Sequence, residues 1–178
     1  MAHNLVIILL GMVLGFTLTI LGISIGLLIE LTPIPYFGKK RKIVKGYFKR
    51  GLKFLRLEPI PLKVYINSTS RYLLKTKQVE ISVENLTKAH ADLYLNPYFS
   101  SKKMYILNNN DHIRFTVFHE LAHHYLATKY PEWQKKQHRL RLSLYYNDGK
   151  GFTHGEYRLL PDERMADKIA FLMMKKIK

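Results

Sequence analysis

The longest hydrophobic segment of this 178-residue chain lies near its beginning, where Leu5–Ile29 contain no ionisable side chain. A helix of these 25 residues, at 1.5 Å per residue, is longer than the hydrocarbon core of a bilayer, which is about 30 Å thick. A cleaved signal peptide would begin with basic residues and end at a small-residue cleavage site, and the sequence has neither. We therefore expect a single transmembrane anchor within residues 1–38.

The remainder of the chain alternates between short strand patterns and longer helical ones. Short segments rich in β-branched and aromatic residues predict strands at 62–66, 79–83, 92–95 and 104–107. A short helix is expected over 67–77, and apolar positions at helical spacing predict helices from about 111 to 130, 131 to 147 and 161 to 178. These elements predict a small α+β domain over residues 58–178.

Four glycines of the apolar run lie on one face of the expected transmembrane helix, because their spacings are 4, 7 and 4 residues. Small residues on one stripe let a second helix approach closely in lipid, which favours a homodimer or another membrane partner. Glycine is also common in membrane helices without any such role, so both interpretations stay open. The four are Gly11, Gly15, Gly22 and Gly26.

A basic segment over residues 39–57 follows the apolar run, with nine Lys or Arg residues and no acidic residue between positions 39 and 56. The positive-inside rule then predicts a single-pass protein whose N-terminus is outside and whose C-terminal domain is cytoplasmic. The segment is also amphipathic, so we expect it to lie along the membrane and to contact anionic lipid. Nucleic acid would suit the same charge, but the nearby apolar run makes lipid the expected partner.

The candidate chemistry depends on histidine and glutamate, because the chain has no cysteine for disulfides, nucleophiles or thiolate metal sites. His119 and His123 are four residues apart in a predicted helix, so both imidazoles can reach one ion. Glu120, beside the first histidine, is placed to act as a general base. Together they form an HExxH motif, a pattern typical of zinc metalloproteases.

A catalytic zinc site needs a third protein ligand. The chain lacks the glycine and histidine that would extend the helix motif to that of the metzincins. Glu163, near the start of the last predicted helix, is the better candidate. Asp167, four residues later, is placed to accept a hydrogen bond from a zinc-binding histidine, as such histidines usually require.

The two motif segments resemble those of a known family. Residues 114–123 read RFTVFHELAH and residues 163–170 read ERMADKIA, which is similar to the "RFTxxHELxH" and "ExxA(N/D)xxA" helices of the ImmA/IrrE-type gluzincin metallopeptidases. The resemblance covers roughly residues 60–178. It implies a compact zincin fold, one Zn²⁺ per chain, and peptide-bond hydrolysis.

The resemblance also implies residue roles: His119, His123 and Glu163 hold the zinc, and Glu120 is the general base. Members of the family typically cleave or regulate helix-turn-helix repressors, so the expected substrate is a cytoplasmic protein, a repressor or another regulator. HtpX-type membrane metallopeptidases share both motifs and an anchored, cytoplasm-facing site, so a membrane quality-control protease is an alternative.

Peptide hydrolysis needs two further features, a group that stabilises the developing oxyanion and a place for the substrate backbone. His154 and Tyr157 are candidates for the first, because their loop leads into the helix that carries Glu163. The predicted strand Met104–Leu107 is the candidate for the second, as an edge strand that pairs with an extended peptide.

A hypothesis of a different class is a membrane-tethered binding module without catalytic activity. Residues 58–178 carry 20 basic and 12 acidic residues, so a basic binding surface is possible. Such a module would not need Glu120, and here Glu120 accompanies all three expected ligands. The sequence therefore favours the zinc endopeptidase.

Overall fold

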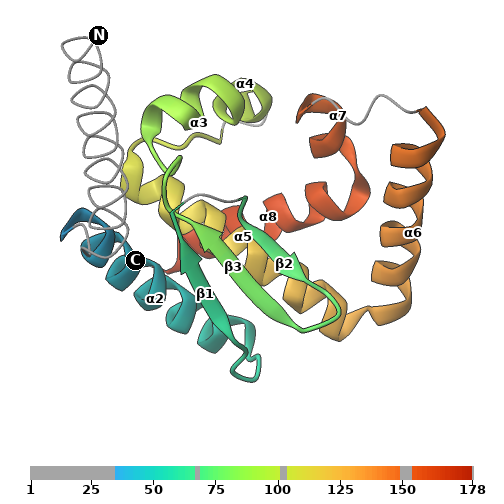
Figure 1. The fold of residues 1–178 in the computed structure, drawn as a ribbon, viewed down its shortest axis with the longest axis horizontal. Coiled ribbons are helices and arrows are strands. Elements are labelled where there is room, and N and C mark those ends of the chain that lie inside the picture. Colours follow the sequence, from blue (N-terminus) through green and yellow to red (C-terminus); the bar gives the residue numbers. More distant parts are fainter. Residues whose placement is uncertain (1–34, 67–68, 101–103, 149–153, 178) are drawn as a thin grey trace, which may run out of the picture. The chain divides into compact units, whose positions relative to one another are not determined.

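The computed structural model describes residues 35–66, 69–100, 104–148 and 154–177 of the chain (Figure 1). The expected transmembrane anchor and its four glycines lie outside these residues. Within the described ranges, no helix is both long enough and apolar enough to cross a membrane. Residues Lys39–Lys178 form one compact unit.

The described elements make a mixed α+β fold, in which a small three-stranded sheet packs against helices (Figure 1). The predicted strands at 62–66 and 79–83 and all three predicted long helices are present. In chain order the elements are α2 (Pro35–Leu55), β1 (Leu62–Tyr65), β2 (Arg71–Leu73), β3 (Gln78–Ser82), α3 (Lys88–Tyr94), α4 (Asn96–Phe99), α5 (Asn109–Lys129), α6 (Pro131–Asp148), α7 (His154–Leu159) and α8 (Pro161–Lys176).

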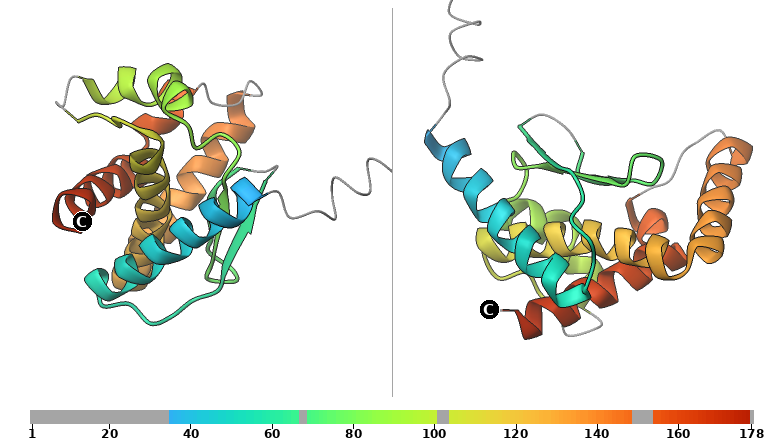
Figure 2. Two further views of the ribbon diagram at one scale, coloured as in Figure 1. Left: turned by 90° about the vertical axis from the view of Figure 1, so that its left-hand side faces the viewer. Right: turned by 90° about the horizontal axis from the view of Figure 1, so that it is seen from below.

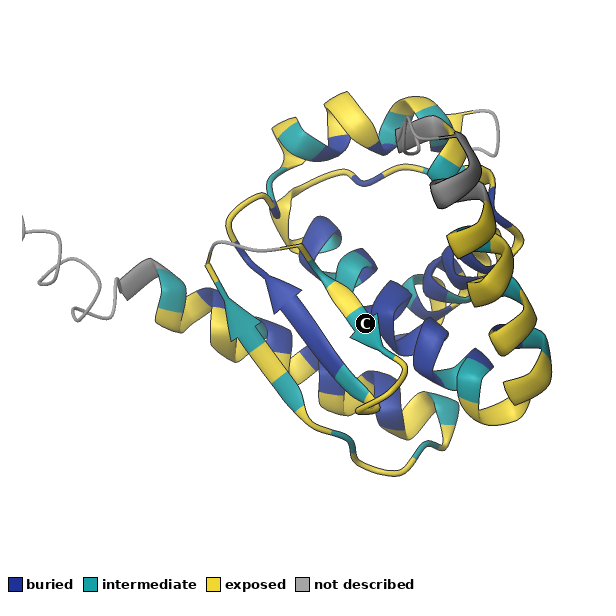
Figure 3. Ribbon diagram, turned by 45° about the vertical axis from the view of Figure 1, so that its right-hand side comes forward, coloured by how far each residue is buried: buried dark blue, intermediate teal, exposed yellow. Residues whose placement is uncertain are grey.

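The sheet has the strand order β1-β3-β2. β1 runs parallel to β3, with Leu62 opposite Val79, whereas β2 runs antiparallel to β3, with Arg71 opposite Glu80. The central strand β3 is the most buried of the three (Figure 3), and its Val79 and Ile81 have no exposed surface. An ion pair of 2.8 Å between Arg71 Nε and Glu80 Oε2 joins β2 to β3. β2 is therefore an edge strand with one side unpaired within the sheet.

Helix α5 is the centre of the core, and twelve of its 21 residues are buried. The sheet and α8 lie on opposite sides of it (Figure 2). Phe115 and Phe118 on α5 are among the largest fully buried side chains, and Phe115 packs against Phe99 and Phe171 with ring centroids 5.2 and 5.0 Å apart. Because α5 is covered on several sides, most of the side chains that it carries are buried.

Helix α2 belongs to this core, and the compact unit that contains most of the helix spans Lys39–Lys178. At Gly51 the helix backbone comes so close to α5 that an added Cβ would lie 2.5 Å from Leu121 Cδ1. The apolar face that the sequence suggested would rest on lipid instead packs inside the protein. Its buried residues are Val44, Tyr47, Phe48 and Leu52.

The predicted strand at 92–95 is wrong, because this segment belongs to helix α3 and its C-cap. The Thr87 side chain accepts a hydrogen bond from the backbone N–H of His90 and begins the helix. The buried positions Ala91, Leu95 and Phe99 then recur every fourth residue across α3 and α4, which is the period of a helix and not of a strand.

The predicted strand Met104–Leu107 is also wrong, since the segment belongs to no sheet. The side-chain amide of Asn96 donates to the carbonyl of Ile106 at 3.0 Å and accepts from its N–H at 2.8 Å. One side chain thus pairs the backbone groups that a neighbouring strand would have paired. Ile106 is buried between exposed Tyr105 and Leu107, and this alternation produced the strand pattern in the sequence.

The short helix predicted over 67–77 is wrong over the described residues 69–77, which contain β2 and a turn. Residues 74–77 form this turn, and Lys77 closes it with a positive φ of 49°. Pairing with β3 holds residues 71–73 in a strand. A local sequence pattern contains no information on such cross-strand contacts, which is why it predicted a helix.

Candidate metal centre

Helix α5 brings His119 and His123 onto the same face. The helix begins at a cap in which the Asn108 side chain accepts a hydrogen bond from the Asp111 N–H at 2.9 Å. The two histidines are four positions apart, slightly more than one helical turn, so their rings project in nearly the same direction. Both are buried, with 5% and 7% of their surface exposed.

Helix α8 places Glu163 and Asp167 opposite these histidines. Pro161 occupies its first turn, where the missing N–H costs nothing. Ala166 and Ala170 have no exposed surface, as expected where two helices pack closely. Arg114 of α5 adds to this contact, because its guanidinium donates to the carbonyl of Met174 at 2.6 Å near the end of α8.

The side-chain atoms of His119, His123 and Glu163 converge on one point. The two imidazole Nε2 atoms are 3.1 Å apart, His119 Nε2 is 3.1 Å from Glu163 Oε2, and His123 Nε2 is 3.3 Å from Glu163 Oε1. With one ligand atom taken from each residue, the three atoms all lie within 4.8 Å of one another. The three residues therefore fit a buried metal site with two nitrogen ligands and one oxygen ligand.

Asp167 and Arg158 support the first histidine from behind. The far nitrogen of His119, Nδ1, lies 3.0 Å from Asp167 Oδ1, and that oxygen accepts a hydrogen bond of 2.9 Å from Arg158. Burial by itself would lower the pKa of His119, but the carboxylates of Asp167 and Glu163 raise it to about 10. A carboxylate at Nδ1 fixes the orientation of the ring and leaves Nε2 facing the metal site.

Arg141 is a member of the site that the sequence did not indicate. It reaches in from α6, donates to Glu163 Oε1 at 2.7 Å, and pairs with the neighbouring Asp162. Burial opposes ionisation of Glu163, yet the two histidines beside it hold the pKa of this carboxyl well below its usual value. The buried carboxylate is therefore charged, the form that binds metal.

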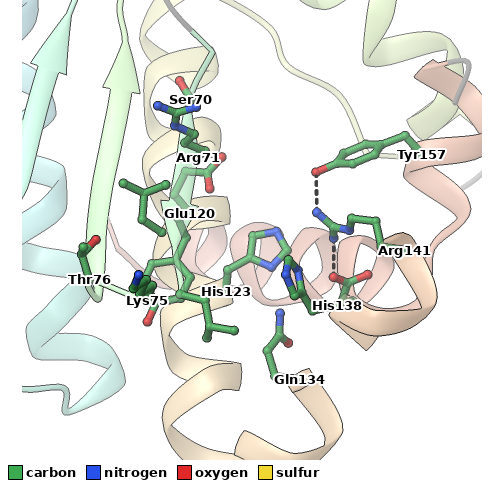
Figure 4. A pocket seen from close by; sticks show the side chains of 14 residues that line it. Ser70, Arg71, Lys75, Thr76, Glu120, His123, Gln134, His138, Arg141 and Tyr157 are labelled. Carbon is green, nitrogen blue, oxygen red and sulfur yellow. Dashed lines mark hydrogen bonds and ion pairs between the residues drawn. The ribbon is translucent and has the colours of Figure 1, made fainter. Parts of the chain in front are cut away.

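A pocket of about 520 Å³ opens beside His123 (Figure 4). His123, Glu120, Arg141 and Tyr157 line it, together with β2 and the turn that follows it. Among the described residues, the Glu120 carboxylate has no hydrogen-bond or ion-pair partner. Burial raises its pKa, which makes this carboxylate a stronger base than an exposed one.

A second hollow of about 200 Å³ lies beside the first, lined by His119, Arg158 and His112 among others. Glu120 and Ser70 line both. Glu120 therefore lies at the border of both hollows.

The structure places Tyr157 at the first pocket, where its hydroxyl accepts a hydrogen bond of 3.0 Å from Arg141. Burial raises the pKa of this phenol, so it stays protonated at neutral pH. His154 begins α7, and its side chain lies outside the described part of the chain. Met104–Leu107, the expected substrate strand, is not part of either pocket wall, whereas β2 is.

Two arginines, Arg141 and Arg158, were missed in the sequence because nothing in their local pattern distinguishes them from surface arginines. Arg141 is 22 residues from Glu163, and only the packing of α6 and α7 near α8 brings the two arginines to the site. His124, next to His123, turns away from the site and contacts the Tyr72 hydroxyl at 3.2 Å.

Comparisons with protein-family models, with curated proteins and with solved structures find no match for this chain. The class is therefore defined by the fold and the site. The protein is an α+β protein with a buried His-His-Glu group in the HExxH…E arrangement, a possible metal site.

Proposed function

We propose that the chain is a zinc-dependent endopeptidase of the gluzincin type, similar to the ImmA/IrrE metallopeptidases. The convergence of His119, His123 and Glu163, next to an unpaired Glu120 at a pocket, is the observation that carries this proposal. Two imidazoles and a carboxylate are a common ligand set for catalytic zinc.

Glu120 is the general base in this proposal. When bound, a zinc ion polarises a substrate carbonyl and lowers the pKa of a water molecule toward about 7. Glu120 takes a proton from the attacking water and passes it to the leaving amine, and its raised pKa favours this proton uptake.

Tyr157 is the group that we assign to oxyanion stabilisation, with Arg141 beside it. Its protonated hydroxyl and the guanidinium 3.0 Å away both lie at the pocket wall. Donors of this kind stabilise the negative charge that develops on the carbonyl oxygen. His154 remains an alternative.

The edge strand β2 is the element that we assign to substrate binding, in place of Met104–Leu107. It is unpaired on one side within the sheet, and its residues form one wall of the pocket that contains Glu120. An extended peptide can pair with such an edge through backbone hydrogen bonds. The expected substrate is an extended segment of a cytoplasmic protein, such as a repressor or another regulator.

The test compares the full-length wild type with Glu120→Gln and Glu163→Gln. Wild-type protein should contain about one zinc per chain and should cleave a library of unstructured peptides, with products identified by mass spectrometry. Glu120→Gln should retain zinc and lose at least about 100-fold in rate, because only the base is removed. Glu163→Gln should lose zinc as well.

Two outcomes would contradict the proposal. Wild-type protein purified and assayed with added zinc that binds none would refute the metal site. Stoichiometric zinc without any cleavage would favour the binding module.

The HtpX-type alternative differs in its substrates. An HtpX-type protease would prefer misfolded membrane proteins over soluble regulators.

A further inference from the structure

Helix α2 presents a cationic face to the outside. At 100° per residue, six exposed basic residues fall within one half of the helix surface. The helix contains no acidic residue, and none of the six forms an ion pair with any residue in the described ranges. They are Lys39, Arg41, Lys42, Lys45, Lys49 and Lys53.

The opposite face of α2 is already occupied by the protein itself. Tyr47 and Phe48 are buried, and the ring of Tyr47 packs edge-on against Phe118 of α5 with centroids 5.9 Å apart. Lys40, a basic residue on this side, is buried and donates to the Val83 carbonyl at 2.8 Å. Arg50, at the border between the two faces, lies over the Tyr47 ring, with its Cζ 4.5 Å from the ring centroid. The helix therefore cannot turn its apolar side toward a partner without opening the core, and what it offers outward is charge.

We propose that the cationic face of α2 docks on the headgroups of an anionic phospholipid bilayer, without insertion of the helix into the hydrocarbon. Lysine and arginine close to an anionic leaflet are attracted within about one Debye length, roughly 8–10 Å. The uncharged run Leu5–Ile29 ends ten residues before Lys39, which favours a bilayer over nucleic acid as the polyanion. This inference does not depend on metal binding or on catalysis.

The test uses a fluorescent label on the full-length chain at Gly46→Cys. Gly46 lies on the exposed side of α2 with no atom within 4 Å of an added Cβ, and the chain has no other cysteine. The protein is reconstituted with phosphatidylcholine vesicles, or with vesicles containing about one third phosphatidylglycerol. Each type carries a nitroxide either at the headgroup or deep in the acyl chain.

The headgroup nitroxide should quench the Gly46→Cys label at least about threefold more in anionic than in neutral vesicles. The deep nitroxide should quench it equally little in both. A label at Lys136→Cys on α6, at the other end of the domain from α2 (Figures 1 and 2), should show no such difference.

The triple change Lys42→Glu, Lys45→Glu and Lys49→Glu should abolish the difference between vesicle types, as should raising salt from about 0.1 to about 0.5 M. Circular dichroism should show an intact fold, and zinc content should be unchanged, because all three side chains are exposed. The proposal would be overturned by equal headgroup quenching in both vesicle types, or by quenching from the deep nitroxide. It would also be overturned if duplex DNA, but not anionic vesicles, protected the label.

Discussion

Asp167 shows how one residue can influence the candidate metal centre without facing it. It contacts His119 Nδ1 at 3.0 Å on one side and Arg158 at 2.9 Å on the other, and it is 1% exposed. A buried carboxylate in this position holds the imidazole in one orientation and increases its basicity as a ligand. Its effect should therefore appear in metal affinity.

Asp167→Asn is expected to weaken zinc binding by about 10- to 100-fold, because an amide cannot supply the negative charge behind His119. Competition with a chromophoric chelator measures this affinity. Asp92→Asn, on an exposed carboxylate of α3 that pairs with Lys88, is the matched control and should change nothing. Unchanged affinity in Asp167→Asn would contradict the assignment.

His112 gives the protein a pH-dependent stability outside the metal centre. Its Nδ1–H donates to the Thr87 carbonyl at 2.8 Å. Burial lowers its pKa to about 4, and the nearby charges of Arg158 and Lys40 act in the same direction. The folded state therefore resists protonation of a side chain that the unfolded chain protonates near pH 6.5.

The sign follows from this difference: the contribution of His112 is fully present above pH 6.5 and is lost as pH falls through 6.5 toward 4. His112→Gln should flatten the decrease of the unfolding free energy between these pH values by at most about 3 kcal/mol. Urea unfolding at several pH values measures it. An equally steep decrease in the variant would show that other groups cause it.

At the scale of elements, the packing of α2 shows that its apolar face belongs to the protein core. Its periodicity suits a helix on a membrane surface, but its apolar side chains complete the core around α5. The close approach of the α2 backbone to α5 at Gly51 can be tested by substitution.

Gly51→Ala should destabilise the domain by about 1–3 kcal/mol, because the new methyl group meets Leu121, Met173 and Phe118 in a packed core. Gly46→Ala, in the same helix with open space around it, should instead stabilise by about 0.5–1 kcal/mol through helix propensity. Chemical denaturation of both variants gives the comparison. Equal effects would mean that α2 is not packed on α5.

At the scale of the whole molecule, the proposed location is a single-pass membrane protein with its N-terminus outside and its catalytic domain in the cytoplasm. Single cysteines at His3 and Lys136 test this in intact cells, since the chain has no cysteine of its own. An impermeant thiol reagent should label the cysteine at His3 and not the one at Lys136. Labelling at Lys136 would show that the orientation is the reverse of the one proposed. Labelling at neither position would exclude an external N-terminus.

Several features of fold and site could be predicted from the sequence, and they share a physical cause. The long helices α5, α6 and α8 have strong local signals: the Asn108 cap, Pro131 and Pro161 at helix starts, and helical spacing of apolar residues. The pairs His119–His123 and Glu163–Asp167 follow from the same helical period, because residues four apart share a face.

Tertiary structure alone decided the rest, because those features depend on contacts between distant residues. The side chain of Asn96 takes both backbone hydrogen bonds of Ile106 and prevents a strand there. Arg141 reaches Glu163 from another helix, and β2 becomes the edge strand beside Glu120. The sequence by itself determined the two helical pairs, His119–His123 and Glu163–Asp167, whereas packing of α5 against α8 brought His119, His123 and Glu163 together as a candidate metal site.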